Sequence, residues 1–195
     1  MTKPVPPRIY LAGPDVFLPN AQSIGLAKCE ICQDHGLSGV FPLDGALDLD
    51  GLLPAEQARR ISLANEGLMR SCDAIIANMT PFRGAAMDSG TAFEVGFMRA
   101  LGKPVFGYSN VTSDYAERAN GIRAIGLPAG DFDAADVQIE DFGLAENLMI
   151  AVAVSETGPA VVRHSSPIEV VGTDLVGFRE AVVAAGRSLK VQPSS

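Results

Sequence analysis

Positive charge is scarce in this chain of 195 residues. Fifteen Lys and Arg residues stand against 23 Asp and Glu residues, which gives a net charge of −8 and a sequence pI near 4.7. A net-acidic protein without a basic run is a poor candidate for binding a phosphate backbone. We therefore expect no polymeric nucleic acid among its partners.

Long apolar runs and an N-terminal signal core are also missing. The longest unbroken apolar stretch covers residues 148–154, far below the roughly 18 residues that indicate a membrane span. The first seven residues, Met-Thr-Lys-Pro-Val-Pro-Pro, contain no apolar signal core. Hydrophobic residues make up 47% of the chain and charged residues 19%, which argues against disorder. We expect a cytoplasmic enzyme or binding domain with no membrane partner.

Cysteine is rare and odd in number, with residues at Cys29, Cys32 and Cys72 only. Three cysteines exclude a disulfide framework. Cys29 and Cys32 form a CxxC with His35 nearby, but a fourth zinc ligand at a suitable spacing is missing. The pair also lies in the middle of an expected helix, whereas a redox pair begins one. We predict buried structural thiols and no metal site.

Strand-like and helix-like segments alternate along the first half, with Gly and Pro between them. We predict strands over 8–12, 37–41, 73–78 and 103–108, and helices over 20–35, 54–71 and 88–101. Such an alternation with short links is typical of a doubly wound parallel α/β sheet.

The second half is less regular. Residues 110–143 indicate loops with short helical turns, followed by helices over 144–155 and 173–188 and a strand near 160–163. We predict a single domain over residues 1–195, with 191–195 as a frayed tail.

Ligands of an open parallel sheet bind beyond the carboxyl ends of its strands. The first such end, Gly13-Pro14-Asp15, contains no GxGxxG fingerprint. A Walker-like stretch from Gly96 to Lys103 has the wrong glycine spacing and lacks the Ser or Thr that holds magnesium. Both phosphate-loop interpretations therefore fail.

One carboxylate lies on an apolar helix face. At about 100° per residue, Phe97, Met98 and Leu101 fall within roughly 60° of Glu94, and no cation stands at its i+3 or i+4 position. An unpaired buried carboxylate costs several kcal/mol. Glu94 is therefore either functional or satisfied locally, since Thr91-x-x-Glu94 also matches a capping box.

Two further polar residues are candidates. Asn65 projects into the apolar stripe of the preceding helix, where it would either serve a ligand or tie down a loop backbone. Arg83, in the loop after the third strand, would face an acidic ligand or pair with Asp88.

Several motifs occur in an order that resembles the nucleoside 2-deoxyribosyltransferases, over about residues 8–150. They are Ile9-Tyr-Leu-Ala-Gly-Pro14 with Val16-Phe17, Cys72-Asp-Ala-Ile-Ile-Ala77, Pro81-Phe-Arg-Gly84, Asp88-Ser-Gly-Thr-Ala-Phe-Glu-Val-Gly96 and Phe142-Gly-Leu-Ala-Glu-Asn-Leu-Met149. The Asp88-x5-Glu94 motif with its following glycine is the most specific of these.

The resemblance implies a flavodoxin-like sheet and the transfer of 2-deoxyribose between nucleobases, without metal or cofactor. It makes Glu94 the nucleophile at the anomeric carbon, through a covalent, retaining, ping-pong reaction. It implies that Tyr10 positions Glu94 and that Asp88 binds the sugar hydroxyls. The small-molecule partners of the protein would then be nucleosides and free nucleobases.

The remaining candidates, for substrate binding, also follow from the resemblance. Phe17, Asn65 and Arg83 belong to this group, and Asn147 with Met149 would reach the site of a neighbouring subunit in a homo-oligomer. Asn65 aligns with a base-contacting position that is Asp or Asn in the family. An amide is not a general acid, so the group that handles the base proton stays open. A tyrosine expected near the C-terminus has no counterpart here.

Three alternatives accompany this interpretation. A nucleoside or nucleotide N-glycosidase would use the same Glu94 and lose the intermediate to water. Gly90-Thr-x-x-Glu94 also loosely resembles the GTxxE of lysine-decarboxylase-like phosphoribohydrolases, but the double glycine before it is missing. In a non-catalytic nucleoside-binding module, Glu94 would only hydrogen-bond the ligand.

Overall fold

The computed structural model describes residues 5–42, 47–124 and 138–191. Its described strands form one parallel sheet in the order β2-β1-β3-β4-β5. They are β1 (Arg8–Ala12), β2 (Ser38–Val40), β3 (Ala74–Asn78), β4 (Val105–Ser109) and β5 (Val162–Arg163). This order is that of the flavodoxin-like fold, which confirms the predicted fold class.

Helices connect the strands and cover both faces of the sheet. They are the short 3-10 helix η1 (Pro14–Phe17), α1 (Ala21–Asp34), α2 (Pro54–Ser71), α3 (Ser89–Ala100), α4 (Tyr115–Ala124), α5 (Leu148–Ser155) and α6 (Val176–Ser188). The predicted tail falls mostly on residues 192–195, which lie outside the described residues.

Two predictions for the second half need correction. Helix α4 occupies part of a stretch that we expected to consist of loops and short turns, because its Gly, Asp and Ala content hides any apolar period. Helix α5 begins at Leu148 and not at 144, because the Asn147 side chain accepts a hydrogen bond from the Met149 amide and caps the helix there.

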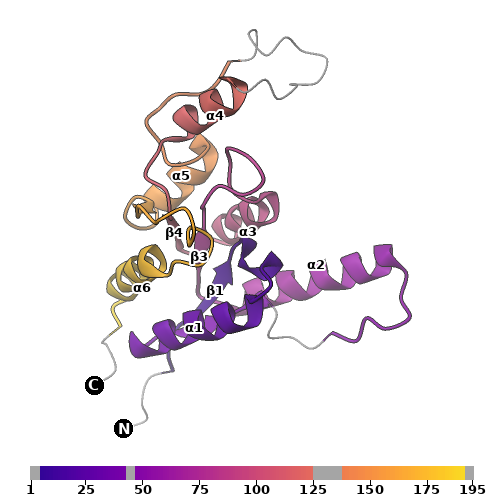
Figure 1. The fold of residues 1–195 in the computed structure, drawn as a ribbon. Coiled ribbons are helices and arrows are strands. Elements are labelled where there is room, and N and C mark those ends of the chain that lie inside the picture. Colours follow the sequence, from indigo (N-terminus) through magenta and orange to yellow (C-terminus); the bar gives the residue numbers. More distant parts are fainter. Residues whose placement is uncertain (1–4, 43–46, 125–137, 192–195) are drawn as a thin grey trace.

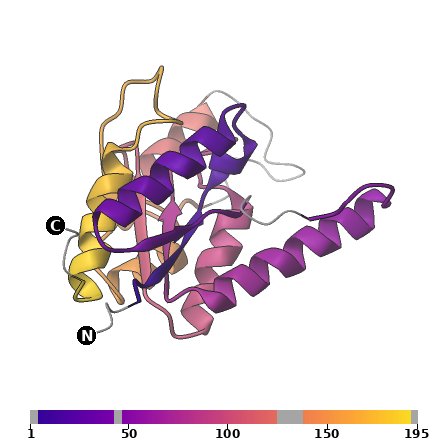
Figure 2. The same cartoon turned by 90° about the horizontal axis from the view of Figure 1, so that it is seen from below.

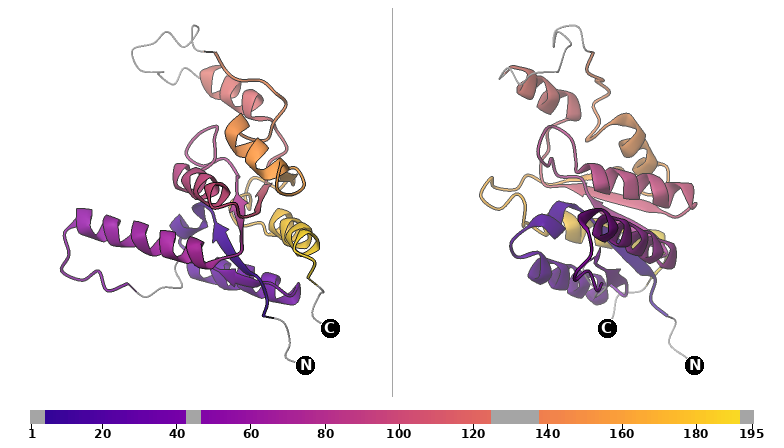
Figure 3. Two further views of the ribbon diagram at one scale, coloured as in Figure 1. Left: turned by 180° about the vertical axis from the view of Figure 1, so that it is seen from behind. Right: turned by 90° about the vertical axis from the view of Figure 1, so that its right-hand side faces the viewer.

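The alternation of side chains along the strands builds two cores. Ile9 and Leu11 of β1 pack with residues of α1 and α6 on one face. Tyr10 and Ala12 of the same strand point to the opposite face, where α2, α3 and α5 contribute. Figure 3 shows α1 and α6 on one side of the sheet and α3 and α5 on the other. Tyr10 is therefore aimed at α3 by the pleat of β1.

Helix α2 projects from the body of the molecule. Figures 1 and 2 show its N-terminal half extending away from the sheet, so that only its C-terminal end packs against the core. Met69 is its one buried residue within the described chain, and Ile61, in the apolar stripe, is 42% exposed. The apolar stripe of α2 is therefore uncovered at Ala58 and Ile61, while Leu68 and Cys72 at its other end pack against the core.

A buried ion pair fixes the turn that follows β1. Lys28 on α1 lies 2.7 Å from Asp15, both almost completely buried, and Asn78 at the end of β3 donates to the same carboxylate at 3.3 and 3.4 Å. A Cβ on Gly13 would meet Asp15 Oδ2 at 2.2 Å, so this turn requires glycine. These contacts hold the turn that follows β1 against the end of β3.

No helix in the described ranges is both long and apolar enough to cross a membrane.

Candidate active site

The strand order places a switch point between β1 and β3, where the connections turn to opposite sides. Ligands of open α/β sheets bind at such a point, beyond the carboxyl ends of the strands. The segments that leave β1 and β3 there contain Phe17, Arg83 and Asp88. Helix α3 begins directly after Asp88 and runs back along the sheet with Glu94 on it.

Glu94 is held from the sheet by a tyrosine. The Tyr10 hydroxyl donates a hydrogen bond of 2.6 Å to Glu94 Oε1, and Tyr10 itself is fully buried. Burial raises the pKa of Tyr10, and the charge of Glu94 raises it further, so this hydroxyl keeps its proton and acts as a donor. The contact that the resemblance implied is present in the structure.

Burial also raises the pKa of Glu94, from 4.5 to about 7. The Tyr10 hydrogen bond lowers it because it stabilises the charged form, and the nearby charge of Asp88 raises it. A carboxyl group with a pKa near neutrality, partly buried among apolar groups, is typical of an active-site residue.

The capping-box alternative for Glu94 is wrong. Helix α3 begins at Ser89, with Asp88 as its cap, and Asp88 Oδ2 accepts from both the amide (3.0 Å) and the hydroxyl (3.2 Å) of Thr91. The Thr91 amide that Glu94 would have accepted from is thus occupied. One Asp88 oxygen serves the helix, and Oδ1 accepts no hydrogen bond from any other described residue.

Glu94 opens into a pocket of about 400 Å³ between α2 and α3. Its described lining combines apolar residues with a few polar groups, namely Ala58, Ile61, Ser62, Asn65, Glu66, Met69, Gly90, Phe93 and Glu94. The volume lies in the range of small-molecule sites. The structure therefore brings Asn65 and Glu94 into the lining of one pocket, to which Ala58 and Ile61 of α2 add apolar surface.

Asn65 has the geometry of a ligand-binding residue. It is half-buried, and within the described ranges its side chain makes no hydrogen bond. The alternative in which it ties down a loop backbone has no support in this part of the chain. Its amide is free to donate and to accept.

Phe17 and Arg83 form a separate cluster. The rings of Phe17 and Phe82 stack with their centroids 5.6 Å apart, and the Arg83 guanidinium lies 5.0 and 4.6 Å from them. Arg83 makes no ion pair with Asp88 or with any other described carboxylate, so that alternative is wrong. Neither Phe17 nor Arg83 is among the described residues that line the pocket.

Asn147 and Met149 lie at the start of α5, outside the pocket of their own chain. Asn147 caps its own helix, because its Oδ1 accepts a hydrogen bond from the Met149 amide. Met149 is 71% exposed.

Glu146 is a residue of this region that sequence reasoning missed. Its buried carboxylate accepts hydrogen bonds from the amides of Met87 (2.9 Å) and Asn147 (3.0 Å) and faces Arg118 at 3.4 Å. It thus ties the loop just before Asp88 to the start of α5. Burial raises the pKa of Glu146, while the two backbone donors and Arg118 lower it.

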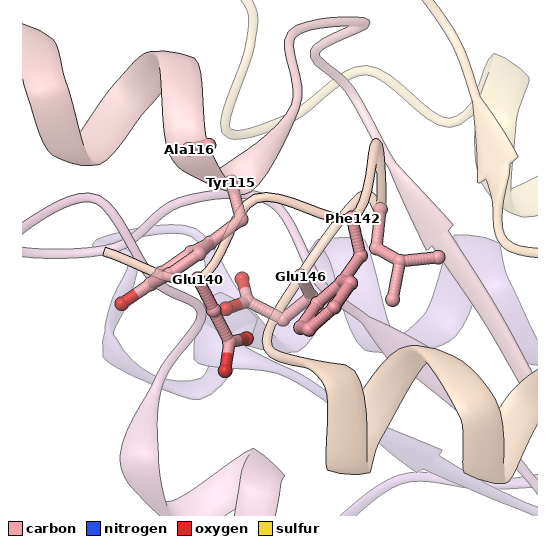
Figure 4. A pocket seen from close by; sticks show the side chains of 6 residues that line it. Tyr115, Ala116, Glu140, Phe142 and Glu146 are labelled. Atoms are coloured by element: carbon pink, nitrogen blue, oxygen red, sulfur yellow. The ribbon is translucent and has the colours of Figure 1, made fainter. Parts of the chain in front are cut away.

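Figure 4 shows Glu146 beside Glu140, Tyr115 and Phe142, around a narrow crevice at this junction. Glu140 accepts from the Leu148 amide at 2.7 Å and so supports the same helix start. No sequence signal separated Glu146 from its neighbours, because its partners are backbone amides brought together only by folding.

The three cysteines form no disulfide, and Cys32 and Cys72 are buried while Cys29 is half-buried. Burial raises the pKa of Cys32 to about 12, as expected for an inert thiol. Among the residues that the structure describes, no three His, Cys, Asp or Glu side chains are grouped so that they could hold a metal ion.

Residues 9–149 match the profile of the nucleoside 2-deoxyribosyltransferase family, and this chain belongs to that family. An uncharacterized protein of Schizosaccharomyces pombe is 41% identical over 119 residues, which are 60% of this chain and 56% of that protein. The chain thus spans just over half the length of this curated relative.

Two solved structures have a similar fold. A 2-desoxiribosyltransferase from Leishmania mexicana matches with a TM-score of 0.59 and 30% identity, over 90% of this chain and 98% of its own. A conserved protein from Enterococcus faecalis V583 matches with a TM-score of 0.54 and 18% identity, over 91% and 98%. At that identity the second match concerns the fold alone.

From the raised pKa of Glu94 we predict how the free energy of unfolding depends on pH. Between its unfolded value of 4.5 and its folded value of about 7, the folded state holds a proton that the unfolded state has lost. Wild-type stability therefore falls as the pH rises through this window, whereas Glu94→Gln does not titrate. The stability of Glu94→Gln relative to wild type should rise by about 3 kcal/mol from pH 4 to pH 8, at 1.36 kcal/mol per pKa unit.

Urea unfolding at the two pH values measures this difference. Glu30→Gln, an exposed substitution on α1, is the control and should show no such rise. A Glu94→Gln difference that is independent of pH would contradict the raised pKa.

Proposed function

We propose that this protein transfers 2-deoxyribose from one nucleobase to another, with Glu94 as the nucleophile. The observation that carries the proposal is the Tyr10–Glu94 hydrogen bond of 2.6 Å, with Glu94 in the lining of a nucleoside-sized pocket. It leaves Glu94 Oε2 to approach the anomeric carbon, while Tyr10 favours the ionised carboxylate that the attack requires.

The proposed reaction has two displacement steps. A Glu94 oxygen forms a bond to C1′ as the C1′–N bond breaks. The electron pair of the broken bond passes to the base nitrogen, and the leaving base takes up a proton. A second base, losing a proton, then attacks C1′ and releases the carboxylate, with net retention. The sugar lacks the electron-withdrawing 2′-hydroxyl, so its oxocarbenium-like state is reached more easily. Asp88 Oδ1 is available to bind sugar hydroxyls.

Nucleosides suit the pocket better than nucleotides. Its described lining holds two carboxylates, Glu66 and Glu94, and no cation. Arg83, the candidate for a phosphate contact, instead lies over the rings of Phe17 and Phe82. A phosphate group would meet like charge there, with no cation in the described lining to offset it. The nucleoside N-glycosidase stays the closest alternative, since it needs the same Glu94.

We further propose that the working unit is a homo-oligomer in which Asn147 of a second copy completes the site. Phe93 on the rim of the pocket is 57% exposed, and at α5 Met149 and Val152 are also exposed. Apolar patches of this kind are typical of interfaces, and a two-fold axis would cover both at once. Three cysteines that form no disulfide also suit the cytoplasmic location that we propose.

Substitution of the nucleophile tests the proposed function. Incubating a deoxynucleoside with a second free base should yield the new nucleoside, and Glu94→Ala should lower this rate by about a thousandfold or more. That loss corresponds to about 4 kcal/mol of transition-state stabilisation. Glu30→Ala, on the other face of the sheet, should retain full activity.

The same assay without the second base separates the alternatives. Free sugar as the only product, with and without the acceptor, would indicate a hydrolase, and no product at all would indicate a binding module. A Glu94→Ala protein that keeps its rate within a few-fold of wild type would exclude Glu94 as the nucleophile.

Complementation tests the shared site. Glu94→Ala and Asn147→Ser should each be inactive, and Ser is chosen because it preserves the cap of α5. In mixed dimers one site carries both lesions and the other neither. Random mixing of equal amounts should therefore restore about a quarter of wild-type activity.

Labelled subunits show whether exchange has taken place. If exchange is complete and activity does not return, Asn147 acts within its own chain and the shared site is wrong.

A further inference from the structure

A second carboxylate lines the pocket, on the helix that faces Glu94. Glu66 of α2 follows directly after Asn65, and both residues contribute to the pocket wall. The side chain of Glu66 is 29% exposed and lies 3.9 Å from the Arg70 guanidinium, which rests 4.9 Å above the ring of Phe97. This distance exceeds a hydrogen bond, so the carboxylate is oriented by Arg70 and still able to accept from a ligand.

The geometry of the proposed displacement determines which part of the substrate lies near Glu66. A nucleophile and its leaving group occupy opposite sides of the carbon that is attacked. With Glu94 of α3 at the anomeric carbon, the leaving base extends away from α3 and toward α2. The polar groups that α2 places on this wall are Ser62, Asn65 and Glu66.

The hydrogen-bonding capacities of these groups are unequal. An ionised glutamate only accepts hydrogen bonds, whereas an asparagine amide both accepts and donates. A base edge that offers an N–H₂ donor next to a ring-nitrogen acceptor matches a glutamate beside an asparagine. An asparagine amide by itself pairs in this way with adenine. In hypoxanthine and thymine the two positions are reversed, since the exocyclic oxygen only accepts and the adjacent ring N–H donates. A carboxylate that faces the exocyclic group would then meet the lone pairs of the carbonyl oxygen.

We propose that Glu66, together with Asn65, reads the exocyclic amino group of the base, so that adenine and cytosine are preferred to hypoxanthine and thymine. This inference rests on the proposed function, because it takes the orientation of the base from the attack by Glu94. Glu66 is in this account a specificity-determining residue and not the nucleophile.

Two paired substrates test the inference. The ratio of kcat/KM for 2′-deoxyadenosine to that for 2′-deoxyinosine, measured with one common acceptor base, should be about ten or more in the wild type. Glu66→Gln should lower this ratio at least about tenfold, since its amide can turn an N–H toward the carbonyl oxygen. Glu56→Gln, on the same helix but outside the pocket lining, should leave the ratio unchanged.

The ratio does not depend on the fraction of folded protein, so a merely structural role of the Glu66–Arg70 pair would not move it. A wild-type ratio near one, or an unchanged ratio in Glu66→Gln, would overturn the inference while deoxyribosyl transfer stands.

If no nucleoside is turned over, the proposed function has failed, and equilibrium binding of the same two nucleosides still decides the inference. Tighter binding of 2′-deoxyadenosine that is lost in Glu66→Gln supports it. Equal binding, or no binding, overturns it.

Discussion

The hydrogen bond between Tyr10 and Glu94 joins the centre of the sheet to α3, and the arrangement of the pocket depends on it. Tyr10 is fully buried, so its hydroxyl needs a partner inside the protein, and Glu94 supplies one. In return the carboxylate is fixed in one orientation among apolar groups. Burial and hydrogen bonding act in opposite directions on the pKa of Glu94, and the balance lies near neutrality.

The residues around Glu94 are held in place by contacts within the fold. Asp88 caps α3 with one carboxylate oxygen and leaves the other available. Glu146, buried beneath the loop before Asp88, links that loop to the start of α5. The carboxylates of the proposed site are thus held in position by backbone amides and by one tyrosine.

Local signals were sufficient to predict the fold but only part of the site. Pro54 and the glycines after the helices marked the element boundaries, and the alternation of elements predicted the doubly wound sheet. The position of Glu94 on an apolar face also followed from helical spacing. The same spacing could not show whether the stripe of α2 packs in a core or lines a pocket, because apolar residues serve both. Glu66 and Glu146 were missed since their surroundings come from distant parts of the chain.

A covalent deoxyribosyl adduct on Glu94 is the most direct test of this account. Rapid acid quenching of the enzyme with a deoxynucleoside, or a slow 2-fluoro analogue, should allow the adduct to be found by mass spectrometry. We predict the mass of one added sugar on the peptide that contains Glu94, together with ping-pong kinetics for the two substrates. Unmodified Glu94 together with intersecting initial-rate lines would mean direct displacement and would contradict the covalent mechanism.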